Sequence, residues 1–252
     1  MPRKTRSSKT QPARRRGSGI PADLDDTLRK ALPDGIVELQ ASADESWFAE
    51  VEDELRSRLS RLDGADVEFE KPAEPSCSVQ DDEDDWEEPP ACNESSRSFH
   101  LFFVVPNDSW ARCQIELERS YEDDQIEHLQ GTELVGCAIG VSLLAKVALV
   151  RLTSLIIYGD GSSSIEPSIH PNIIDEENKP VDPHDYWARR YQGEELRALL
   201  DLEQQVSGAL ASLGIRLLSD QEAAIVVPDL RVGEACLEEP VQLCDAFFFA
   251  VP

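Results

Sequence analysis

Residues 134–157 read LVGCAIGVSLLAKVALVRLTSLII, a long apolar stretch that decides what kind of fold the chain can have. Its 24 residues would reach across a bilayer, which takes about 20. Lys146 and Arg151 interrupt it, however, and each charge costs roughly 2.5 to 3.5 kcal/mol near a bilayer centre. We therefore expect the stretch to be buried in protein. Its glycines and β-branched residues favour two strands that break near residues 144–146.

The segments on either side predict further strands. Residues 99–106, FHLFFVVP, form a short apolar run that ends at a proline, and apolar and polar residues alternate from 111 to 118. The turn residues between these runs predict that they pair as an antiparallel hairpin, followed by a loop or short helix at 126–129. Further strands are expected at 215–218, 224–227 and 246–251.

Helical patterns flank the strands. Apolar residues recur at three- and four-residue spacings over 194–213, with Gly214 where a C-cap belongs, and a shorter helix is expected to begin at Asp182 and Pro183. A short helix at 23–32 and an amphipathic helix over 42–62 are expected earlier in the chain. Together these patterns predict an α+β fold with a mixed or antiparallel sheet and one long helix in the C-terminal half.

Charge divides the chain into four parts. The 252 residues hold 50 Asp and Glu against 24 Lys and Arg, a formal net charge of −26. The parts are a disordered basic arm at 1–19 (net +7), a helical segment at 20–64 (−7), an acidic, proline-containing linker at 65–97 (−10) and an α+β domain at 98–252 (−16). Because most of the surface would repel a polyanion, the composition argues against a general DNA or membrane-surface binder.

The basic arm and the cysteines bear on location. Residues 1–19 lack the apolar run that a secretory signal requires. The six cysteines fall at irregular spacings with no zinc pattern, and a disulfide between Cys236 and Cys244, the one close pair in the expected domain, is the less favoured alternative. We therefore expect a cytoplasmic protein with free thiols, in which Cys113 and Cys137 act as small core residues. For the arm itself, a nuclear-type address, a nucleic-acid tether, a partner for the acidic linker and an inert tail all stay open.

One polar loop carries residue types suited to a divalent metal or to acid–base chemistry: His170, Asp175, His184 and Asp185. A loop separates His170 from His184, so no His-x-x-x-His type of pair fixes two ligands on one element, and we favour ordinary loop and helix-start roles and expect no cofactor.

The candidate interaction residues lie in two places. Trp187, Arg189, Arg190 and Tyr191 fall together on the helix expected after Pro183, and these types are enriched at protein interfaces. Trp86 stands among seven acids at 81–88, a composition typical of segments that fold onto basic partners. The competing interpretations are stacking on nucleic-acid bases or packing on its own domain for the helix, and a merely solvated linker for Trp86.

Three functional hypotheses follow. The first is an acidic protein-interaction or regulatory protein, of the adaptor or inhibitor kind, whose partner is another protein with a basic surface. The second is a metal-dependent enzyme that uses the loop from His170 to Asp185. The third is a nucleic-acid-associated protein tethered by residues 1–19. The first accounts for the charge over most of the chain, and we prefer it.

Overall fold

The computed structural model describes residues 19–37, 46–71, 96–120, 126–159, 163–166, 183–232, 240–248 and 250–251. The helices are α1 (Ala22–Ala31), α2 (Ser46–Leu59), α3 (Pro183–Arg190), α4 (Glu194–Ser212), α5 (Asp220–Ala223) and α6 (Leu243–Phe247), with a 3-10 turn, η1, at Ser109–Ala111. The strands are β1 (Ile36–Val37), β2 (Ala65–Lys71), β3 (Ser96–Arg97), β4 (Phe99–Pro106), β5 (Arg112–Ser120), β6 (Ile126–Ser142), β7 (Val147–Tyr158), β8 (Ser163–Glu166), β9 (Arg216–Leu217), β10 (Arg231–Val232) and β11 (Ala250–Val251).

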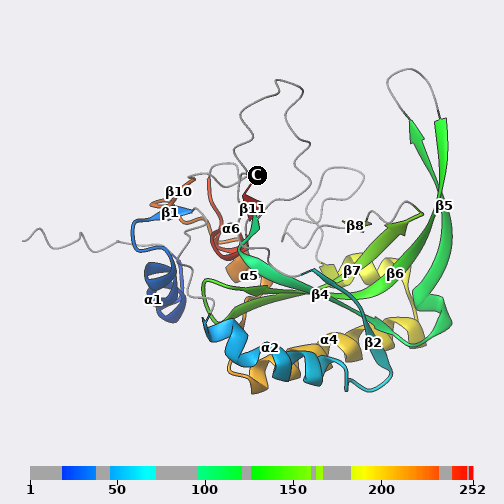
Figure 1. Cartoon of the computed structure of the whole chain (residues 1–252), viewed down its shortest axis with the longest axis horizontal. Coiled ribbons are helices and arrows are strands. Elements are labelled where there is room, and N and C mark those ends of the chain that lie inside the picture. Colours follow the sequence, from blue (N-terminus) through cyan, green and yellow to red (C-terminus); the bar gives the residue numbers. More distant parts are fainter. Residues whose placement is uncertain are drawn as a thin grey trace, which may run out of the picture.

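A curled seven-stranded sheet forms the centre of the molecule (Figure 1). Its strands follow the order β2-β4-β6-β7-β8, with β5 paired to β6 and β9 to β7. The β7–β9 pair is parallel and the other ladders of this sheet are antiparallel. The predicted α+β class with a mixed sheet is confirmed, as are the long helix α4 in the C-terminal half and the amphipathic helix α2.

The stretch 134–157 forms the middle of this sheet. It supplies parts of β6 and β7, which pair from Gly131 opposite Tyr158 to Val141 opposite Ala148, with the break at 143–146. Alternate residues of β7 enter different apolar clusters, because successive side chains of a strand point to opposite faces. Burial on both faces explains why this stretch reads as continuously apolar.

Helices cover both faces of the sheet. On one face α1, α5 and α6 contribute Leu24, Leu28, Ala223 and Phe247 to the core. On the other face α2 and α4 lie side by side (Figure 1) and bury an apolar stripe each. The stripes consist of Phe48, Leu55 and Leu59 on α2 and of Leu199, Leu202, Val206 and Leu210 on α4.

The predicted hairpin of 99–106 with 111–118 is wrong. β4 pairs with Cys137–Ser142 of β6 and β5 pairs with Ile126–Leu134, so the two strands follow one another along the same edge of β6. The turn residues lead into η1 instead of reversing the chain onto β4. Residues 126–129, expected as a loop or short helix, therefore belong to β6, and β5 and β6 form a long hairpin that projects from the sheet (Figure 1).

Three other boundaries differ from the predictions. Residues 65–71, assigned to the acidic linker, form β2 and pair with β4, with a bulge between Val67 and Phe69; the alternation of apolar and acidic residues over 65–70 is the strand pattern that the acidic composition of the segment concealed. Residues 219–223 form a capped helix, and 224–227 contribute only an isolated bridge at Val226. The expected strand at 246–251 is divided between the end of α6 and β11, since Gln242 and Asp245 form a capping box there.

Candidate functional site

Two polar groupings stand out among the described residues. The first, which we call the His100 cluster, contains Glu52, Arg56, Glu70 and His100 from α2, β2 and β4. The second, which we call the α4–α5 cavity, is a hollow of about 370 Å³. Its lining residues come from β7, α4 and the β9–α5 segment: Val150, Glu203, Ser207, Leu217, Leu218, Ser219, Asp220 and Gln221.

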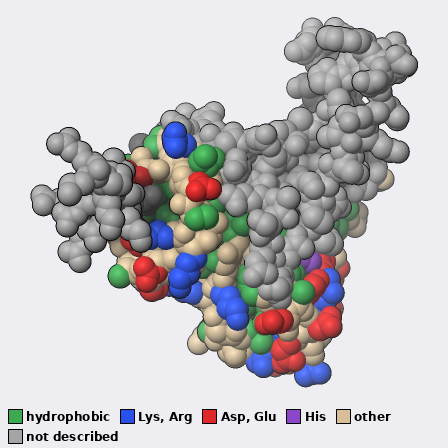
Figure 2. Space-filling view, turned by 60° about the vertical axis from the view of Figure 1, so that its left-hand side comes forward, with side chains coloured by type: hydrophobic (Ala, Val, Ile, Leu, Met, Phe, Trp, Pro, Cys, Tyr) green, Lys and Arg blue, Asp and Glu red, His purple; other side chains and the backbone are tan. Residues whose placement is uncertain are grey.

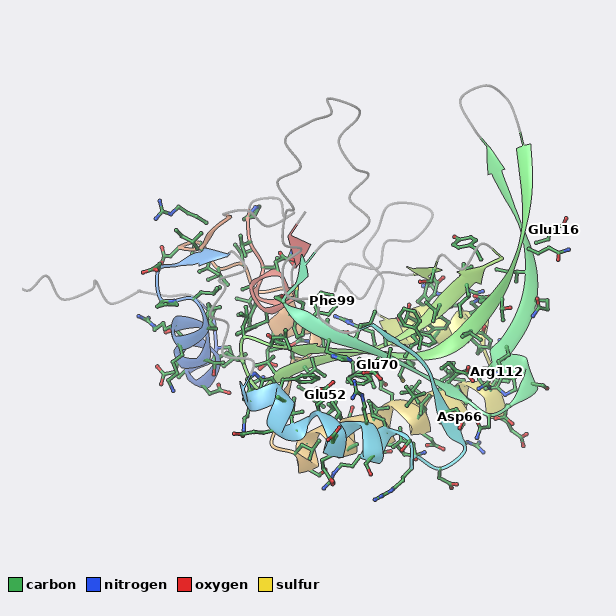
Figure 3. The ribbon with its side chains drawn as sticks, viewed as in Figure 1. Glu52, Asp66, Glu70, Phe99, Arg112 and Glu116 are labelled. Carbon is green, nitrogen blue, oxygen red and sulfur yellow. The ribbon has the colours of Figure 1, made fainter. Side chains whose placement is uncertain are left out.

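The β2 bulge builds the His100 cluster. Before the bulge Val67 packs on the α2–α4 side of the sheet, and after it Phe69 packs on the opposite side. The next residue, Glu70 (labelled in Figure 3), pairs with Phe102 of β4 and so lies on the α2–α4 side. There it contacts His100. Bulges commonly re-aim a side chain in this way.

His100 is the polar member of an aromatic stack. Its ring is 3% exposed, lies 4.5 Å from the Phe102 ring and 5.0 Å from the Phe48 ring, centroid to centroid. Its Nε2 lies 2.6 Å from Oε1 of Glu70. Burial lowers the pKa of His100 because it disfavours the charged ring, while the Glu70 carboxylate acts in the opposite direction. A neutral ring that donates from Nε2 fits this arrangement.

Arg56 supplies the positive charge of the cluster. Its Nη2 lies 2.6 Å from Oε1 of Glu52 and 2.6 Å from Oε1 of Glu70. Burial raises the pKa of Glu70, but the hydrogen bonds from Arg56 and His100 outweigh that effect and lower the pKa overall. The possible ligand atoms of Glu52, Glu70 and His100 lie within 4.8 Å of one another, as in a metal centre, yet the guanidinium already occupies the role of the cation. We interpret the cluster as a structural ion-pair network.

Three of the four predicted interaction residues at 187–191, namely Trp187, Arg190 and Tyr191, pack on the protein itself. Trp187 is fully buried and donates from Nε1 to the carbonyl of Leu152 at 2.9 Å. Tyr191 stacks on it at 5.8 Å, and Arg190 lies over both rings while pairing with Glu133 at 2.7 Å. Arg189 is exposed. Trp187 is thus a core residue, and of the four predicted interaction residues at 187–191 only the arginines and the half-buried Tyr191 reach the surface.

The remaining predicted candidates are placed as follows. Asp185 is exposed in the first turn of α3, whose backbone also contains His184. His170, Asp175 and Trp86 lie outside the described residues. Cys137 is buried as expected, but Cys113 is exposed, because it lies on the outer hairpin strand β5.

Sequence reasoning missed both polar groupings. His100 is the one polar side chain in the apolar run 99–106, and that is a signal that a histidine is being buried with a partner. The α4–α5 cavity offered no such signal, because its lining comes from three separate segments of the chain.

Comparisons with known proteins identify no relative: no family model matches the chain, and no curated protein or solved structure matches it. In the part of the chain that the structure describes, no helix is both long and apolar enough to span a membrane.

Proposed function

We propose that this chain is an acidic protein-interaction or regulatory protein that recognises a basic surface on another protein. One observation carries the proposal: about half of the arginines in the described ranges are paired with carboxylates of the same chain, although acids outnumber bases there. Seven of the thirteen described arginines form such ion pairs, namely Arg29, Arg56, Arg58, Arg112, Arg151, Arg190 and Arg216. On the face shown in Figure 2, basic and acidic side chains accordingly interleave.

This pairing leaves carboxylates in excess. The described ranges contain 27 acids and 16 bases. The residues outside them, apart from 1–18, add 23 acids and a single base, Lys179. A surface of this kind attracts and orients a cationic partner, since complementary potentials increase the rate and the specificity of encounter.

Apolar docking is less well supported. Among the large hydrophobic side chains that the structure describes, only Leu200 and Val226 are exposed, at 38% and 43%. Scattered single apolar residues are normal on a monomer and do not make an interface core. Recognition through charge is therefore the function that the described surface supports best.

A cytoplasmic location is part of the proposal. None of the described cysteines, Cys113, Cys137 and Cys244, forms a disulfide, as a reducing compartment would ensure. The enzyme hypothesis based on the His170 loop and the nucleic-acid hypothesis based on the basic arm rest largely on residues outside the described ranges, and no described feature favours either.

Titration of the full chain with a fluorescent peptide of Lys, Arg, Gly and Ser tests the proposal, with a Glu-rich peptide as the control. We expect binding that weakens steeply from about 0.1 M to about 1 M NaCl, over which the Debye length falls from about 10 Å to about 3 Å. Peptide binding near Trp86 should change the tryptophan fluorescence of the wild-type chain. Loss of that change in the W86F variant would show that residues 81–88 contact the peptide. No binding at low salt, or an affinity that salt leaves unchanged, would refute the proposal.

A further inference from the structure

We propose that the α4–α5 cavity accepts one basic side chain, a lysine or an arginine, of the protein partner. The inference rests on the proposed function and adds the place where the partner is anchored. About 370 Å³ lies near the lower end of ligand pockets, which span roughly 300 to 1,000 Å³, and suits one side chain better than a folded element.

The cavity lining matches the two chemical parts of such a side chain. Val150, Leu217 and Leu218 supply apolar surface, against which the methylene stem of a lysine or arginine packs. Glu203 and Asp220 supply carboxylates for the cationic head. The lining itself holds two carboxylates and no lysine or arginine, and the cation paired with Asp220, Arg151, lies outside the lining, so a cationic ligand suits this cavity better than an anionic one.

An ion pair with the sheet fixes the position of Asp220. Its Oδ1 pairs with the buried Arg151 of β7, which holds the carboxylate at the cavity, while the side chain of Asp220 remains 41% exposed. The capping box between Ser219 and Glu222 fixes the start of α5 on which Asp220 lies. A pre-positioned carboxylate binds a cation without the entropic cost of ordering it.

Glu203 and Ser207 define the opposite wall. They are one turn apart on α4 and therefore lie on the same face of that helix, both half-buried. Because α4 is also packed through Leu202 and Val206 on the sheet, this wall is rigid. The cavity thus lies between two fixed elements and has one carboxylate on each.

Two matched substitutions on α4 test the anchor with the same basic peptide used for the full chain. E203Q removes the charge inside the cavity, whereas E194Q removes the same charge from an exposed position on the same helix. We expect E203Q to raise the Kd about threefold to tenfold and E194Q by less than about twofold. S207L fills the cavity with the charge intact and should weaken binding at least as much as E203Q.

A second measurement locates the ligand directly. N-acetyl-arginine amide, titrated into the isotopically labelled full chain, should shift the backbone amide signals of residues 217–221, and the neutral analogue N-acetyl-norleucine amide should not. Equal effects of E203Q and E194Q, or shifts confined to other segments, would overturn the anchor while leaving charge-driven binding intact. If the wild-type chain fails to bind the basic peptide at all, the proposed function fails and the anchor with it.

Discussion

The imidazole Nε2 of His100 lies 2.6 Å from the carboxylate Oε1 of Glu70, and Arg56 donates to that same oxygen. One carboxylate thus connects a buried ring on β4 with a cation on α2. Because a buried polar ring without a partner would cost free energy, the contact allows a histidine to occupy an otherwise aromatic and aliphatic layer. It also makes the stability of this layer depend on pH.

Lowering the pH below about 6.5 should destabilise the fold through His100. Its pKa is lowered in the folded chain, so the unfolded chain takes up the proton first, and stability is lost as the pH falls from 6.5 through the folded-state pKa. Glu70, Glu52 and Arg56 face the ring, and the two carboxylates limit the loss. Urea unfolding at pH values between 7.5 and 5 measures this loss in the free energy of unfolding. The difference between wild type and H100F isolates the contribution of His100. If the free energy of unfolding had the same pH dependence in both proteins, the role assigned to His100 would be contradicted.

Removing Arg56 should convert the His100 cluster from an ion-pair network into a site that responds to metal. In wild type the guanidinium lies between Glu52 and Glu70, so we expect neither EDTA nor added Mn²⁺ or Zn²⁺ to shift the melting temperature. In R56M the two carboxylates and the histidine lose their counter-ion, and a divalent cation should restore part of the lost stability. A cation-induced shift in wild type would show instead that Arg56 is displaced by a metal.

Trp187 should affect stability far more than binding. W187F removes the hydrogen bond to the Leu152 carbonyl and leaves a small void, with an expected loss of about 2 to 4 kcal/mol in the free energy of unfolding. R189A alters an exposed side chain on the same helix and should change that free energy by less than about 0.5 kcal/mol. Chemical denaturation of both variants measures these changes, and a loss for W187F as small as that for R189A would contradict the packing role of Trp187.

The sequence predicted local elements better than their pairing. The stripe on α4 and the glycine beyond it, with φ +71° at Gly214, follow from local rules, and so does the division of 134–157 into two strands. The arrangement of β4 and β5 along one edge of β6 does not follow from local rules, because strand pairing and register depend on contacts between residues that are distant in sequence. The bulge that places Glu70 beside His100, and the lining of the α4–α5 cavity, likewise arise only from tertiary contacts.

Arg216 should control the acid stability of the contact between α1 and α5. It pairs with Asp23 of α1 at 2.6 Å and with Glu222 of α5 at 2.8 Å, and its hydrogen bond is the main reason that the pKa of Glu222 falls to about 2. A lowered carboxyl pKa stabilises the fold above the unfolded value of 4.5, and this contribution is lost as the pH falls from 4.5 to about 2. In R216Q the carboxyl carbon signal of Glu222 should titrate close to 4.5. A midpoint that stays near 2 would assign the shift to the Ser219 cap.

Gly136 marks the point at which β4 separates from β6, and it should tolerate no side chain. A Cβ there would lie 2.0 Å from the carbonyl oxygen of Val104, the last residue of β4 that pairs with β6. Because the obstacle is backbone, G136A must displace a central strand, and we expect a loss of at least about 2 kcal/mol in the free energy of unfolding.

Gly208 is the matched control: it lies inside α4 with no atom within 4 Å of the position of a Cβ. G208A should stabilise the protein by about 0.5 to 1 kcal/mol, since alanine favours the helix. If G136A unfolded at the same urea concentration as wild type, the close approach of β4 to β6 at this glycine would be wrong.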